Sequence, residues 1–542
     1  MVLHRRGRLA LAIAVVLAAG CSRVAGVAPH APPSVAARHR WTIPDTLRVG
    51  VGNVPRTLNP LLATQVVENS IDSLFADKLV SMDGQGNLVP VLAQAVPTQA
   101  NGDISADGLT IRYRLRHGVK WHDGVPFTSA DVRFTFGAVM NPDNDIISRN
   151  GYDDVASVAT PDSYTVVFHL KRPYGPFVAT VFSESDSPYE IVPEHLLGKL
   201  HDINNAPFNS APIGTGPFKF VRWLRGDRIE FTRNDDYFLG KPKLKTIVVK
   251  LIPDENTEVE QLKTHELDWM WEASTNAYKA IKGDPDLHIL LSPLNGYYAI
   301  MFNNARPPTS DIRVRRAITY AVDKAELARD LTFGEAVPAT EDLPSFMWAY
   351  DTTLQPTPHD LAVAKADLAA AGYGPAHPLP LELYYEQSSA LLKSAAVIVQ
   401  TTLAPLGIEV HIHPQLSSVI YGGYGAGGTL ARGTYEIALY QWIAGVDPDD
   451  SSQFMCRNRP PQGYDQSEYC SPVADAAEDA ALHSYDRATR KRAYARVQEQ
   501  LAKDLPLDFL LWYKNVQPIN LDLKGFDPNP VTDTWNVYRW SI

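Results

Sequence analysis

The strand–helix–strand pattern of residues 379–413 is the feature of this sequence that most restricts the fold. Residues 379–385 read as a strand rich in apolar and aromatic residues, and residues 408–413 read as a second one. Between them, residues 390–406 carry apolar residues at helical spacing. This rhythm implies a sheet flanked by helices, so the sequence predicts an α/β protein.

Other segments carry equally clear patterns. A capping box at Thr128 and Asp131 opens a helix, Asp311 precedes another, and Gly372 ends one that begins near residue 359. Residues 472–503 predict two successive helices. Further strands are predicted at residues 47–51, 111–115, 164–170 and 507–513.

Length and charge limit the classes of protein that fit. A chain of 542 residues exceeds what one hydrophobic core usually serves, so we expect two or three lobes. The formal net charge is −11, and no long run of Lys and Arg follows the N-terminus. Such a field repels phosphate backbones, so we expect no nucleic-acid partner.

The N-terminus has the pattern of an export signal. Arg5, Arg6 and Arg8 precede an apolar run at residues 9–19, which is shorter than the roughly 20 residues that a membrane span needs. A basic start followed by a short apolar run is typical of a secretory signal peptide, predicted here over residues 1–20.

The signal ends at a cysteine. The sequence Leu17-Ala18-Ala19-Gly20-Cys21 resembles the bacterial lipobox, although Ala18 stands where leucine is commoner. The resemblance implies lipidation of Cys21, a tether over residues 21–44, and an exported protein anchored to the outer face of the cell membrane. The alternative is a plain signal peptide cut nearby, with Cys21 incidental.

Two cysteines remain in the exported chain. Cys456 and Cys470 stand 14 residues apart across a polar, proline-rich segment. Because disulfides persist outside the cytoplasm, we predict that they pair, which would stabilise the segment by about 3 kcal/mol. Two free thiols are the alternative, and a zinc site would need more ligands than these.

The sequence carries no complete enzyme motif. It lacks a Gly-x-Ser-x-Gly elbow and a Walker-type loop, and His265-Glu266 lacks the second histidine of a zinc protease. His411 and His413 alternate on a predicted strand and could share one face toward a metal, but an ordinary exposed strand face is the preferred interpretation. We therefore predict no catalytic residue, metal or cofactor.

One segment identifies a family. Residues 113–132, YRLRHGVKWHDGVPFTSADV, closely resemble the hallmark segment of the extracellular solute-binding proteins of the peptide/nickel ABC-importer family. The resemblance spans about residues 45–542. Its other matches, in the family's order, are NPL at 59–61, PIGTGPF at 212–218, RNDDY at 233–237, DIRVRRA at 311–317 and AVDK at 321–324.

The resemblance implies a two-lobed periplasmic-binding-protein-like fold with an extra N-terminal domain and a ligand cleft between hinged lobes. It implies a monomer that delivers its solute to the membrane permease subunits of an ABC importer. The implied segments are 45–75, 212–300 and 498–542 for lobe I, 76–211 for the extra domain and 301–497 for lobe II.

The resemblance also implies where a ligand would bind. Peptide-binding relatives pair the ligand backbone with strand edges, here residues 52–55 and 440–449. The aromatic clusters at 269–271, 297–298, 442 and 512–513 suit a cleft, although core packing is preferred for most of them. The predicted ligand-binding residues are Asn53, Val54, Trp271, Asn303, Trp442, Ala444, Gly445 and Asp447.

Recognition of the ligand's α-amino group is the open question. In peptide-binding relatives an aspartate usually stands three residues after the tryptophan, but Gly445 occupies that position here. Either Asp447 has taken over the pairing with the ammonium group, or amine recognition is weakened and the solute differs. The alternative is that Asp447 only caps the turn that follows it and does not contact the ligand.

The leading interpretation is a binding protein that captures short peptides between two lobes. The same fold could bind a non-peptide solute such as haem, a nickel complex or an oligosaccharide. A regulatory lipoprotein that has lost transport is a second class, and an enzyme on this scaffold is a third.

Overall fold

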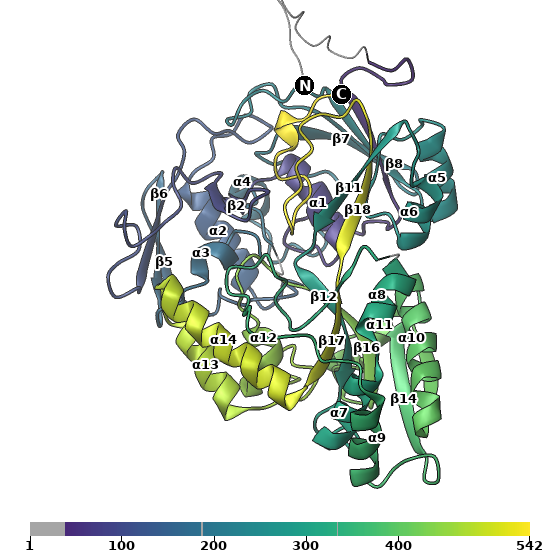
Figure 1. Cartoon of the computed structure of the whole chain (residues 1–542). Helices are drawn as coiled ribbons and strands as arrows, with labels where there is room; N and C mark the ends of the chain where they lie inside the picture. Colours follow the sequence, from purple (N-terminus) through teal and green to yellow (C-terminus); the bar gives the residue numbers. More distant parts are fainter. Residues whose placement is uncertain (1–37, 186–187, 333) are drawn as a thin grey trace, which may run out of the picture. The chain divides into compact units, whose positions relative to one another are not determined.

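The computed structural model describes residues 38–185, 188–332 and 334–542, of which Trp41–Ile542 form one compact unit (Figure 1). The predicted signal peptide, Cys21 and residues 22–37 of the predicted tether lie outside the described residues. The last tether residues pack on the body, since Trp41 stacks on His265 and Thr42 Oγ1 donates to Asp522. In the described part of the chain, no helix is long and apolar enough to cross a membrane.

A seven-stranded sheet forms the first layer. Its order is β11-β18-β10-β1-β9-β8-β7, with β1 parallel to β9 and β10. Helix α1 (Val66–Phe75) packs on one face, and α5 (Glu255–Lys263) and α6 (Thr275–Ile281) contribute to a separate apolar core around Met270. The strands are β1 (Thr46–Val51), β7 (Phe218–Leu224), β8 (Arg228–Arg233), β9 (Thr246–Leu251), β10 (Trp269–Met270), β11 (Leu287–Pro293) and β18 (Lys514–Asn520).

A six-stranded sheet forms the second layer, in the order β13-β17-β12-β16-β14-β15. The predicted strand–helix–strand unit is confirmed in it, because α10 (Ala390–Leu403) connects β14 to β15 and the two strands are parallel. The strands are β12 (Gly296–Phe302), β13 (Val337–Pro338), β14 (Leu379–Glu386), β15 (Ile408–Gln415), β16 (Ile437–Ile443) and β17 (Leu507–Trp512).

Helices cover both faces of the second sheet (Figure 1). Strand β12 alternates: Ile300 and Phe302 join the core formed with one group of helices, whereas Ala299 and Met301 join the core on the other face. The first group contains α7 (Ile312–Ala321), α8 (Lys324–Thr332), α9 (Leu361–Ala370) and α10; the second contains α13 (Pro472–Leu482) and α14 (Arg487–Asp504). Strand β12 is therefore held by apolar packing on both faces.

A third core occupies the region predicted as the extra domain. Strands β4 (Thr110–Arg114), β6 (Thr165–Leu170) and β5 (Val155–Asp162) form a three-stranded antiparallel sheet, and β2 (Val80–Met82) pairs with β3 (Leu88–Pro90). Helix α2 (Ser129–Met140) starts at the predicted capping box. The short helices of the whole body are α3 (Phe177–Thr180), α4 (Glu194–Leu197), α11 (Ser417–Ile420) and α12 (Ser451–Phe454).

The secondary-structure predictions are confirmed. Asp311 caps α7, Gly372 follows the end of α9 at a φ of 93°, and residues 472–503 form α13 and α14.

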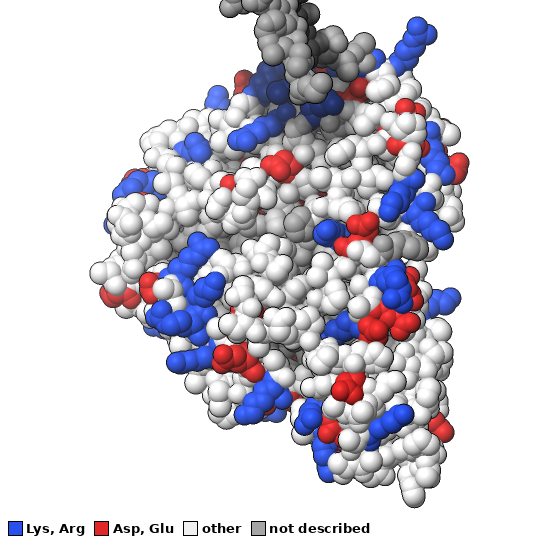
Figure 2. All heavy atoms as spheres, in the orientation of Figure 1, with Lys and Arg blue, Asp and Glu red and all other residues white. Residues whose placement is uncertain are grey.

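On the face shown in Figure 2, basic side chains (Lys and Arg) and acidic side chains (Asp and Glu) are interspersed.

Two short connections join the sheets. Leu294 and Asn295 link β11 to β12, and Tyr513 links β17 to β18. The paired strands β11 and β18 lie in the first sheet, and β12 and β17 are paired in the second. Segments 212–300 and 498–542, both predicted for lobe I, therefore contribute strands to both sheets, because β12 and β17 belong to the six-stranded sheet. The boundaries of the lobes stay a prediction.

Candidate ligand-binding cavity

A cavity of about 2240 Å³ is lined by residues of both sheets. This volume exceeds the roughly 300–1000 Å³ of ordinary small-molecule sites, so the cavity has room for an extended solute. Its wall brings together segments that are far apart in the sequence, among them residues 52–53, 272–276, 388–394, 440–443, 460–464 and 513–516.

Three polar side chains line the cavity where the chain crosses between the sheets. The rings of Tyr298 and Tyr513 lie 4.7 Å apart between centroids, and Gln441 Nε2 donates to the Tyr513 hydroxyl. Tyr298 on β12 lies opposite Gln441 on β16 in the strand register. Burial raises the pKa of both tyrosines, so they act as neutral hydrogen-bonding groups.

Strand β16 offers a backbone edge to this cavity. On one side it pairs with β12 along its whole length, but on the other side β14 pairs with it only at Ile437 and Ala438. From Tyr440 to Ile443, no strand in the described part of the chain covers that second side. Residues 440–443 all line the cavity, so an extended ligand can reach this edge.

The direction of the free backbone groups follows from the register. Ala444 N donates to Asn295 O, which makes Ala444 a hydrogen-bonded partner of β12. Alternation along an antiparallel pair then turns the N–H and C=O groups of Gln441 and Ile443 away from β12. One donor and one acceptor on each residue are therefore available on the uncovered side.

Aromatic rings flank the edge. Tyr440 and Trp442 lie 6.2 Å apart between ring centroids with nearly parallel planes, and Tyr464 lies 6.4 Å from Trp442. Such rings give apolar contact area with polar groups at their margins. They suit varied ligand side chains rather than one fixed shape.

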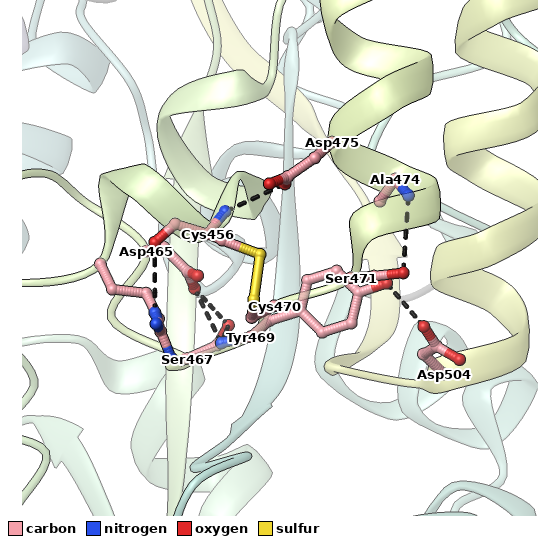
Figure 3. Close-up of a disulfide and its surroundings, with 10 residues drawn as sticks. Cys456, Asp465, Ser467, Tyr469, Cys470, Ser471, Ala474, Asp475 and Asp504 are labelled. Carbon is pink, nitrogen blue, oxygen red and sulfur yellow. Dashed lines mark hydrogen bonds between the residues drawn. A yellow bond between two sulfur atoms is a disulfide. The ribbon is translucent and has the colours of Figure 1, made fainter.

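Tyr464 belongs to the segment closed by a disulfide. The predicted bond between Cys456 and Cys470 is present (Figure 3). Cys456 N donates to Asp475 of α13, and the Tyr469 hydroxyl donates to Asp504 of α14. The closed segment contributes residues 460–464 and 466 to the cavity wall.

Five acidic residues line the cavity in the described part of the chain, and four of them have hydrogen-bond partners. Glu272 differs, because no described residue forms a hydrogen bond or an ion pair with its carboxylate. The donors to the other four are Ser274 to Glu255 (2.7 Å), Tyr278 to Glu335 (2.9 Å), Ser388 to Glu386 (2.6 Å) and Arg329 to Asp330 (2.8 Å).

The surroundings of Glu272 disfavour its charge. It follows β10 at a φ of 54°, a conformation that side-chain-bearing residues seldom adopt. Burial raises the pKa of Glu272 to about 8, and the nearby Asp533 adds to the shift.

Of the predicted ligand-binding residues, Asn53 and Trp442 line the cavity. Val54 is exposed and lies outside the lining. Trp271 is buried and donates its Nε1 hydrogen to Asp533 over 2.7 Å. Asn303 is buried and donates to the carbonyl oxygens of Gly433 and Tyr435. Trp271 and Asn303 thus have structural partners within the protein, and the contact of all three residues with a ligand stays a prediction.

The segment after Trp442 is held by other contacts. Ala444 N donates to Asn295 O over 2.7 Å, and the Asn295 side chain donates to Gly445 O. Asp447 pairs with Arg490 of α14, whose Nη1 donates to Asp447 Oδ2 over 2.9 Å. The two side chains are only 10% and 8% exposed, and Asp447 is outside the cavity lining. Its role as partner of a ligand ammonium stays a prediction without support from this geometry.

His411 and His413 do share one strand face, as the sequence suggested. Both rings hydrogen bond to the Glu382 carboxylate of the adjacent strand, which raises the pKa of His411. Within residues 38–185, 188–332 and 334–542, no group of three or more His, Cys, Asp and Glu side chains is placed to hold a metal ion.

Gln441 lies within the predicted edge 440–449, but sequence reasoning did not assign Glu272, Tyr298 or Tyr513 to the site. The aromatic pairs at 297–298 and 512–513 were visible, but core packing was preferred for them. Glu272 stands beside Trp271 without any motif, and only its position in the cavity distinguishes it from other acids.

Comparison with known proteins shows which proteins this chain is similar to. Residues 87–463 match the family model described as bacterial extracellular solute-binding proteins, family 5 Middle. The chain is 27% identical over 509 residues to the oligopeptide-binding protein AppA of Bacillus subtilis (strain 168), covering 91% of each chain. It is 28% identical over 500 residues to the glutathione-binding protein GsiB of Pectobacterium atrosepticum, covering 91% of this chain and 93% of the relative.

Solved structures of proteins from the same group of relatives also match this chain. The structure of AppA from Bacillus subtilis in complex with a nonapeptide matches with a TM-score of 0.80 and 26% identity, covering 91% of this chain and 98% of that one. NikZ from Campylobacter jejuni in complex with Ni(L-His) matches with a TM-score of 0.80 and 27% identity, covering 92% and 100%. The predicted two-lobed binding-protein fold is confirmed by these matches.

Proposed function

Because this chain belongs to family 5 of the bacterial extracellular solute-binding proteins, we propose that the solute it binds is a short peptide. Its role is that of a substrate-binding component of an ABC importer and not that of an enzyme, as in the rest of its family. Membership of the family does not identify the solute, since relatives bind a nonapeptide, glutathione or Ni(L-His).

The uncovered edge of β16 is the observation that carries the proposal. A peptide in extended form has the same spacing of N–H and C=O groups as a strand, so it can pair with Gln441 and Ile443. Backbone pairing does not depend on side chains, so one edge can accept many sequences. The large cavity beside it leaves room for those side chains.

Binding to both sheets favours closure. The lining joins β16 in the six-stranded sheet to residues 272–276 and 514–516 beside the seven-stranded sheet. A ligand that contacts both sides stabilises the closed arrangement relative to the open one. Membrane permease subunits then accept the solute from the closed protein.

We further propose that Cys21 carries a lipid and that residues 21–44 tether the body to the outer face of the cell membrane. The lipobox-like sequence before Cys21 supports this anchor. A monomer suffices for the mechanism, because one chain supplies both sides of the cavity.

Native mass spectrometry of the body, purified without denaturation from a bacterial host, tests the proposal. We expect a series of retained masses that fit short peptides. A single retained mass of glutathione, a nickel complex, a porphyrin or a hexose series would replace the peptide with that solute. A protein that retains nothing and captures no peptide from an added random pool would contradict the proposal.

A further inference from the structure

We propose that Glu272 recognises a positively charged group of the solute, the α-ammonium group of a peptide, from the side of the cavity that faces β16. This assignment rests on the proposed peptide function. It places amine recognition on the segment after β10 and not on the segment after Trp442, where Gly445 and Asp447 stand.

The first argument is the pairing of the acids. Among the acidic residues that line the cavity in the described part of the chain, Glu272 is the one without a hydrogen bond or an ion pair to the protein. Asp447, by contrast, is buried against Arg490. Ionisation of a half-buried carboxyl group without a partner charge is costly, so Glu272 favours the protonated form until a cationic ligand supplies that charge.

The second argument is the fixed backbone on both sides of Glu272. Trp271 N donates to Gly50 O, and Trp271 Nε1 donates to Asp533. Ala273 N donates to Val516 O of β18. These bonds hold Glu272 at its positive φ of 54°, and such a strained conformation persists only where the surroundings impose it.

The third argument is the character of the neighbours. The groups that face Glu272 are Asp533, which helps to raise the pKa of Glu272, and the hydroxyls of Tyr298 and Tyr513, whose pKa values the Glu272 carboxylate helps to raise. Glu255 and Lys514 line the same cavity, but neither forms an ion pair with Glu272 among the described residues. An ammonium group at this point would meet a carboxylate together with aromatic rings, which also attract cations.

Proton linkage gives a signature that does not require a variant. Burial and Asp533 raise the pKa of Glu272 to about 8, so the group is mostly protonated at pH 6. An ammonium ion favours the carboxylate, so binding must release the proton. The affinity for free peptides therefore rises by up to about tenfold between pH 6 and pH 7, a range in which the peptide amine keeps its charge.

The experiment compares two ligand pools on four proteins. The pools are random tri- to pentapeptides and the same peptides after N-acetylation. The proteins are the wild type, Glu272→Gln, Asp447→Asn and Glu266→Gln; Glu266 is an exposed acid of the same region outside the cavity lining, so its variant controls for net charge. Capture is measured by native mass spectrometry, and affinity by calorimetry at pH 6 and pH 7.

We expect the wild type and Glu266→Gln to capture the free pool at least tenfold better than the acetylated pool. Glu272→Gln should capture both pools equally and lose the pH dependence. Equal capture of both pools by the wild type, or a preference retained in Glu272→Gln, would overturn the assignment and leave the peptide function intact. Capture of neither pool by the wild type would overturn the peptide function and the assignment with it. If Glu272→Gln does not fold, the wild type decides at pH 6 and pH 7: because Asp533, with a pKa of about 6, also titrates there, a pH dependence that free and acetylated peptides share, or no pH dependence, overturns the assignment.

Discussion

At the scale of single residues, Asp447 and Glu272 differ in the partners that the fold gives them. Asp447 follows the tryptophan segment in which relatives carry an amine-pairing aspartate, yet its charge is balanced by Arg490. Glu272 follows β10 without any recognisable motif and has no such partner among the described residues. The difference arises from α14, which brings Arg490 against Asp447.

Asp447→Asn tests the structural role of the ion pair. The change leaves the Arg490 guanidinium buried without a counter-charge, so we expect the free energy of unfolding to fall by about 3–5 kcal/mol. Urea unfolding measures it, and the double variant Asp447→Asn/Arg490→Met should recover part of the loss. If Asp447→Asn keeps its stability but loses the preference for free peptides, Asp447 pairs with the ligand amine and not chiefly with Arg490.

At the scale of single elements, local side-chain bonds decide where the helices begin. Thr128 Oγ1 accepts from Ala130 N, and Asp131 Oδ2 accepts from Thr128 N over 2.9 Å. Both bonds are made by residues within one turn, which explains why the sequence alone predicted the start of α2. The same holds for Asp311 at α7.

Thr128→Ala should lower the free energy of unfolding by about 1 kcal/mol, because an N–H group of the first turn of α2 loses its acceptor. Thr128→Ser keeps the capping oxygen and serves as the control, with a stability within about 0.5 kcal/mol of the wild type. Chemical unfolding of the three proteins measures the difference. An equal loss in both variants would place the cost in packing of the threonine methyl group.

The disulfide segment is the element that couples stability to the cavity wall. Replacing both cysteines, Cys456→Ser/Cys470→Ser, should lower the free energy of unfolding by about 3 kcal/mol, because the unfolded chain regains loop entropy. It should also weaken peptide capture, since residues 460–464 line the cavity. A reducing agent should shift the unfolding midpoint of the wild type only; an unchanged wild-type midpoint would contradict the prediction.

At the scale of the whole molecule, buried carboxyl groups make stability depend on pH. Burial raises the pKa of Glu190 to about 7 and those of Glu258, Asp465 and Glu478 to about 8. The folded protein therefore binds more protons than the unfolded chain between about pH 4.5 and pH 8. The stability from these groups is present below the unfolded pKa and is lost as the pH rises through the folded values.

We expect the melting temperature to fall between pH 6.5 and pH 8. Each group contributes up to about 1.4 kcal/mol per pH unit below its folded pKa. Burial lowers the pKa of His122 to about 4, which affects stability only below about pH 6.5 and so leaves this window clear. Calorimetric scans measure the trend, and Glu478→Gln should reduce it. A melting temperature that stays constant or rises would contradict the assignment of these raised pKa values.

The sequence by itself determined the elements, the disulfide and the family. Strand and helix periods are properties of neighbouring residues, so 379–385, 390–406 and 408–413 were predictable without knowledge of the fold. The disulfide was predictable because the export signal leaves two cysteines. The hallmark segment at 113–132 was sufficient to indicate the family, and the match over residues 87–463 confirms it.

The resemblance indicated Asn53 and Trp442, but only the tertiary structure decided which other side chains line the cavity. Residues 52–53, 272–276, 440–443 and 513–516 meet because strands distant in the chain pair across two sheets. Whether an acid is balanced within the protein or left to a ligand depends on the groups that packing brings beside it. For Asp447 that group is Arg490, 43 residues away in the sequence, and for Glu272 no described residue supplies one.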